Sequence, residues 1–246
     1  MICALSFLGL SDQSARVRRQ VLAELPSHGH APTVAHGKFF AGVAPELFFG
    51  DIEACQSQSA ELICYCAEKK VAQVGVWGAL FRACASATLK PSEDNIAALR
   101  GEMANYRSSR IGRSLYLAYL AEALLMAGDV KGAEAALHEG LVFVEESGER
   151  YWLAELHRIQ GRVWLNRPEP DRERAQTCFL QAINIVRGQE ARVLELRAAT
   201  DLARLWRDTG SHNDPRALLE PILAAIEGGE NLRDVRNARA LLAELV

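Results

Sequence analysis

The chain has 246 residues and a mass of 27.0 kDa, which is enough for a sizeable hydrophobic core. Apolar residues make up 49% and charged residues 24% of the chain, and these values exclude a disordered protein. Basic and acidic side chains number 28 and 31, and the net charge of -3 argues against a nucleic-acid-binding surface over the whole molecule.

The sequence predicts a cytoplasmic protein. No uncharged apolar run approaches the roughly 18 residues that a membrane-spanning helix needs. Of the six cysteines only Cys64 and Cys66 are close together, and on a helix their thiols point about 200° apart, so they do not share a metal ion. We expect free cysteines, buried as small apolar residues in a reducing compartment.

The first predicted element is a half-helix that ends near Gly9. A full first helix of a helix pair is longer, roughly 10–14 residues in a typical globular protein. We therefore expect a truncated first repeat. The chain is then the C-terminal portion of a longer protein, or its N-terminal face is covered by a partner, including a second copy.

A helix is predicted from about Pro32 to Phe49, with Pro45 kinking or ending it. The segment around its start holds His28, His30 and His36, three imidazoles that suit a metal ion but that we interpret as part of a polar loop between repeats. A Gly-Lys pair also falls in this helix, but phenylalanine follows it, so it does not match the phosphate-binding loop.

A common pattern runs along the whole chain, in which a helix is followed by a short break and a second, alanine-rich helix. Aligning one small residue in the first turn of each second helix gives spacings of 40, 40, 38, 42 and 42 residues. The aligned residues are Ala15, Cys55, Asn95, Ala133, Ala175 and Ala217. This period indicates stacked helix pairs.

The last three second helices place a small, a larger and another small residue on one face. Small residues let a neighbouring helix approach closely, and the larger residue fills the gap between helices. We expect buried faces formed by Ala133, Leu137 and Gly140, by Ala175, Phe179 and Ala182, and by Ala217, Pro221 and Ala224.

The first helices share a signature of their own. Ala203 and Trp206, with Leu202 before them and Gly210 after them, have equivalents in Gly161 and Trp164, and then in Ala121, Leu124 and Gly128. Glycines at 148, 188 and 228 predict helix ends, and prolines at 168 and 170 predict a loop within the fifth pair. A last helix, at about 232–245, is expected to cap the stack.

These residues resemble the tetratricopeptide repeat (TPR), a helix-turn-helix unit with a W-x2-L-G-x2-Y…A-x3-F…P pattern. The resemblance covers nearly the whole chain in a degenerate form, because the period is about 40 rather than 34 residues. It implies an all-α fold: a single domain of residues 1–246 forming a right-handed α-solenoid of about six helix pairs with a C-terminal capping helix.

A closer resemblance lies in the segments 151–161 and 194–206. Both are similar to the repeat region found C-terminal to bacterial adenylate/guanylate cyclase and predicted-ATPase signalling modules. In that family the repeats are regulatory and not catalytic. The resemblance therefore implies a regulatory role, without a cofactor or a metal ion.

Arginines gather on the expected inner surface of the first helices, at positions 158, 162, 197, 204 and 207. Planar guanidinium groups suit a carboxylate, an acidic peptide or a phosphate. The candidate anion-binding groove thus consists of Arg158, Arg162, Arg197, Arg204 and Arg207. The alternative is a solvated face neutralised by Asp201, Asp208, Glu195 and Asp234.

We expect a non-catalytic protein- or peptide-binding scaffold within a bacterial signalling protein, because no compact set of acid, base and nucleophile is evident. The first alternative is a sensor domain that binds a small anionic molecule or acidic peptide in its groove. The second is an RNA-binding helical repeat, against which the net charge of -3 argues.

Overall fold

The computed structural model describes residues 1–106 and 111–245, which form helices and short connections without a β-strand. The all-α prediction is confirmed. The chain divides into two compact units, where the sequence analysis treated residues 1–246 as one domain. The first unit comprises Met1–Ser6 and Leu10–Arg110, and the second comprises Phe7–Gly9 and Ile111–Val246.

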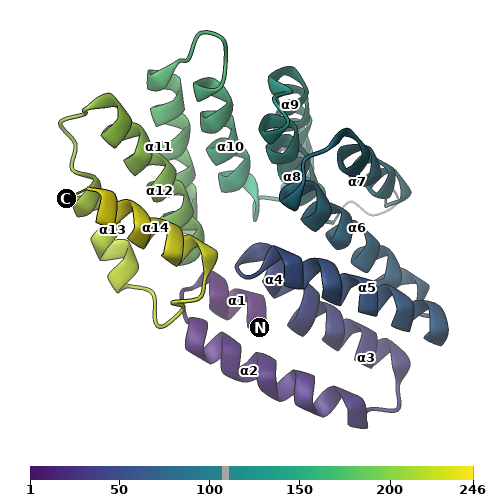
Figure 1. Cartoon of the computed structure of the whole chain (residues 1–246). Coiled ribbons are helices and arrows are strands. Elements are labelled where there is room, and N and C mark those ends of the chain that lie inside the picture. Colours follow the sequence, from purple (N-terminus) through teal and green to yellow (C-terminus); the bar gives the residue numbers. More distant parts are fainter. Residues whose placement is uncertain (107–110, 246) are drawn as a thin grey trace. The chain divides into compact units, whose positions relative to one another are not determined.

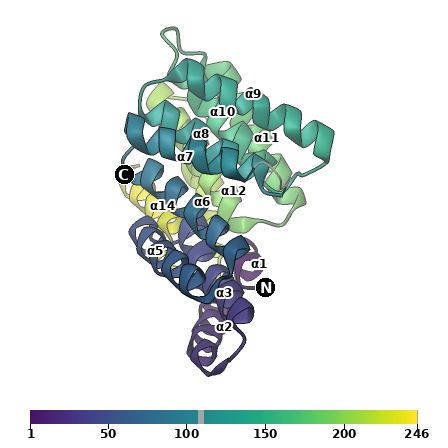
Figure 2. The same ribbon diagram turned by 90° about the vertical axis from the view of Figure 1, so that its right-hand side faces the viewer.

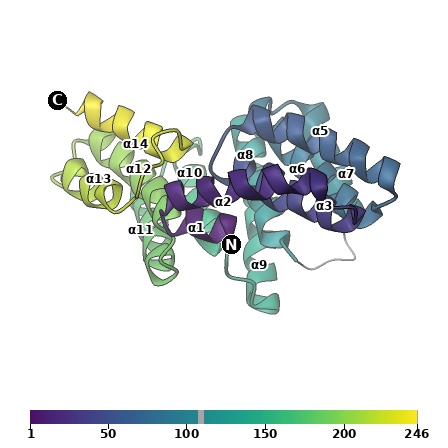
Figure 3. The same cartoon turned by 90° about the horizontal axis from the view of Figure 1, so that it is seen from below.

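The first unit contains most of α1 and all of the helices up to α7. Helix α5 packs along α6, which in turn packs on α7 (Figure 3). The bounds are α1 (Ile2–Phe7), α2 (Ser11–Glu24), α3 (Ala31–Gly37), α4 (Ala44–Phe48), α5 (Ile52–Lys69), α6 (Ala72–Leu89) and α7 (Glu93–Asn105), with a 3-10 turn at Leu25–Ser27.

The helix expected from about Pro32 to Phe49 does not end at Pro45, but it changes to a π-helical form before this residue. Helix α3 continues through a π-helical turn at Lys38–Val43 into α4, whose first turn contains Pro45. Proline has no N–H to donate, and its ring collides with the carbonyl four residues earlier in a regular helix. The wider π turn directly before Pro45 accommodates the ring without ending the helical path.

The second unit is built from neighbouring helices joined by short loops (Figures 1 and 2). Each helix from α8 to α12 packs on the next one, and α10 also contacts α8 and α12, while α12 contacts α14. The bounds are α8 (Arg113–Met126), α9 (Val130–Ser147), α10 (Leu153–Leu165), α11 (Arg172–Gly188), α12 (Arg192–Thr209), α13 (Pro215–Ala224) and α14 (Arg233–Glu244).

The faces predicted on α9 and α11 are buried. Ala133 and Ala175 have no exposed surface. A Cβ added at Gly161 would lie 2.6 Å from the Phe179 ring, and one added at Gly140 would lie 2.9 Å from a methyl group of a leucine on α10. Small residues at these positions therefore allow the close helix approach that the sequence predicts.

The face predicted on α13 is wrong. Ala217 is exposed, and the buried residues of this helix are Leu219 and Ile222. The reason is the position of the N-cap: Asp171 precedes its aligned alanine by four residues, but Asp214 precedes Ala217 by only three. One residue turns a side chain by about 100° around the helix, so the alignment places Ala217 on the solvent side.

Two of the three predicted helix ends are confirmed, because α9 ends directly before Gly148 and α11 ends at Gly188. The third is wrong, because α13 ends four residues before Gly228. Gly148 and Gly210 directly follow helices and Gly128 lies two residues after α8, and they adopt positive φ angles of 73°, 61° and 84°, a conformation that favours glycine. The predicted last helix corresponds to α14. None of the helices within the described part of the chain combines the length and the apolar character needed to cross a membrane.

Candidate functional site

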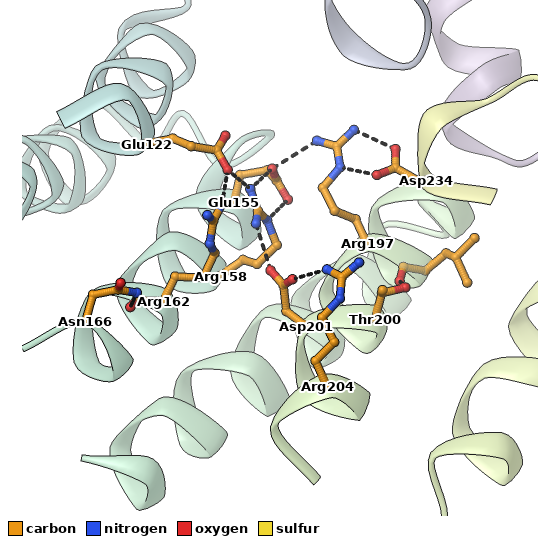
Figure 4. A network of polar contacts seen from close by, with 11 residues as sticks. Glu122, Glu155, Arg158, Arg162, Asn166, Arg197, Thr200, Asp201, Arg204 and Asp234 are labelled. Carbon is orange, nitrogen blue, oxygen red and sulfur yellow. Dashed lines mark hydrogen bonds and ion pairs between the residues drawn. The ribbon is translucent and has the colours of Figure 1, made fainter. Parts of the chain in front are cut away.

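Charged side chains from every second helix of the second unit meet in one cluster, which we call the ion network (Figure 4). Helix α8 contributes one residue, α10 three, α12 three and α14 one. Four are carboxylates and four are guanidinium groups, so the cluster is electrically neutral: Glu122, Glu155, Asp201 and Asp234, with Arg158, Arg162, Arg197 and Arg204.

Arg158 is the centre of the ion network. Its Nε donates to Oε1 of Glu155 at 3.0 Å and its Nη2 to Oε2 at 3.1 Å, so the two groups pair through two parallel hydrogen bonds. The same Nη2 donates to Glu122 on α8 at 3.1 Å, and Nη1 donates to Asp201 on α12 at 2.8 Å. The side chain is only 5% exposed, so these charges pair with little access for water.

Arg197 extends the ion network to α14. Its Nε and Nη2 donate to the two carboxylate oxygens of Asp234 at 2.9 and 2.8 Å, and its Nη1 donates to Glu155 at 3.0 Å. Glu155 therefore joins Arg158 on its own helix to Arg197 on α12. The Glu155 and Asp234 side chains are each 4% exposed, so both carboxylates depend on these guanidinium groups for compensation.

Arg162 and Arg204 lie at the solvent side of the ion network. Arg162 pairs with Glu122 and is 32% exposed, while Arg204 donates to Asp201 at 3.2 Å and is 42% exposed. Among the residues that the structure describes, each makes an ion pair to one carboxylate, whereas Arg158 pairs with three. Their contribution to stability is correspondingly small.

The guanidinium groups keep two of the carboxylates, those of Glu122 and Asp234, ionised. Burial alone would raise the pKa of Glu122, but Arg158 and then Arg162 outweigh it and lower that pKa to about 2. Burial likewise opposes ionisation of Asp234, and the guanidinium of Arg197 lowers its pKa below the ordinary value. The pKa of Arg158 is raised because three carboxylates outweigh the effect of burial.

The structure brings together four of the five arginines of the expected groove and places the fifth elsewhere. Arg207 donates to Asp208 at 2.8 Å and pairs with Glu244 at the end of α14. All five guanidinium groups thus already pair with carboxylates of the chain. An anion would meet guanidinium groups whose charge carboxylates already compensate, so the contacts give no support to a preformed anion-binding groove.

The partners in the ion network were foreseen only in part. Asp201 and Asp234 act as the expected neutralising residues. Glu195 pairs instead with Arg187 near the end of α11 and with Arg192 at the start of α12. The alternative of a solvated face also fails at the centre, where the pairs are buried. Glu122 was missed, although it precedes Arg162 by one repeat period of 40 residues.

The other chemical candidates remain dispersed. His30 contacts a threonine hydroxyl, and His36 contacts the carbonyl of Pro32 at 2.8 Å. Within residues 1–106 and 111–245, no group of three histidine, cysteine or acidic side chains is arranged to hold a metal ion. The cysteines are free, and Cys55, Cys66, Cys84 and Cys178 are buried, as the sequence predicts for those four, whereas Cys64 is exposed.

Comparison with known proteins does not assign the chain to a family. No protein-family model matches the sequence, and no curated protein is significantly similar to it.

Proposed function

We propose that the chain is a non-catalytic, TPR-like helical-repeat module that binds protein or peptide partners. The observation that carries this proposal is that the residues of the ion network all lie on alternate helices, namely α8, α10, α12 and α14. When helices are paired and the pairs are stacked, every second helix faces the same side, and its side chains line one surface. The right-handed solenoid of about six pairs, with α14 as its cap, belongs to this proposal.

The packing of the second helices supports the same arrangement. Ala133 on α9 and Ala175 on α11 are fully buried and 42 residues apart, and each is followed four residues later by a large buried side chain. Equivalent contacts at a fixed spacing are the signature of repeated structural units. The resemblance to the repeats of cyclase and ATPase signalling proteins supports a regulatory role in the cytoplasm of a bacterial cell.

A peptide-display selection against the full chain tests this function. We expect an enriched peptide family whose binding is weakened by charge reversal at Arg204 or Arg207, which are partly exposed on α12. The matched control is Arg216→Glu, since Arg216 is equally exposed but lies on α13. Absence of any enriched family, or equal sensitivity to all three variants, contradicts the proposal.

A sensor for a small anion or acidic peptide is the second candidate. It is favoured only by the partial exposure of Arg162 and Arg204, which are 32% and 42% exposed. Because each is already ion-paired, binding should be weak and should fall as salt rises. Titration with acidic peptides and nucleotides at low and high salt distinguishes this candidate, and Arg162→Ala should weaken any binding observed.

A further inference from the structure

We draw no further inference here: the strongest candidate, the aromatic surface patch of His36, Phe40 and Trp77 beside the π-helical turn of the first unit, carries nothing because nothing in the structure shows what covers it.

Discussion

Replacing Arg158 by leucine should reduce the free energy of unfolding of the second unit by about 3–5 kcal/mol. The side chain is 5% exposed and makes four hydrogen bonds to three carboxylates. Charge-assisted hydrogen bonds contribute about 1.5–3 kcal/mol each, but the leucine side chain recovers apolar contacts. The remaining arginines also neutralise part of the charge, so the expected loss is smaller than the sum of the four bonds.

Urea unfolding of the full chain, followed by circular dichroism and by hydrogen exchange of the α10 amides, measures this loss in the second unit. Arg204→Leu is the matched control. It removes one hydrogen bond of 3.2 Å from a side chain that is 42% exposed, and it should cost less than about 1 kcal/mol. Equal effects of the two substitutions would refute the interpretation of Arg158 as the centre of a buried network.

Three further predictions concern other parts of the chain. The pKa of Glu122 is lowered to about 2, so its contribution to stability is complete above the ordinary carboxyl pKa of about 4.5 and is lost as the pH falls toward 2. In urea titrations, Glu122→Gln should therefore reduce the loss of unfolding free energy between these two pH values. Gly161→Ala should lower the thermal midpoint, because its Cβ would lie 2.6 Å from the Phe179 ring, and an unchanged midpoint would contradict the close helix approach. Burial raises the pKa of Cys55 to about 12, so iodoacetamide at pH 8 should label exposed Cys64 in the native protein and label Cys55 only after unfolding.

The all-helical class and the buried faces of α9 and α11 could be predicted from the sequence, because they depend on local signals. Asp129 and Asp171 cap α9 and α11 four residues before the aligned alanines, and these alanines are buried as expected. The prediction failed on α13, where the cap is one residue closer to the aligned alanine and the buried face turns away from it. A period read from small residues alone does not detect a shift of one residue.

The site was harder to predict than the fold. The sequence places Arg158 and Arg197 on neighbouring first helices, but periodicity does not show which carboxylates they meet. That depends on the register between helices, which brings Glu122 to Arg158 from 36 residues away and Asp234 to Arg197 from 37 residues away.

The most direct test of the stacked arrangement is a double-mutant cycle between Arg197 on α12 and Asp234 on α14. Their two hydrogen bonds of 2.9 and 2.8 Å join alternate helices, and the side chains are 10% and 4% exposed. Urea unfolding of Arg197→Leu, Asp234→Leu and the double variant gives the coupling free energy. We predict at least about 1.5 kcal/mol, the value of a desolvated charged pair, whereas a coupling below about 0.5 kcal/mol would contradict a shared surface on alternate helices.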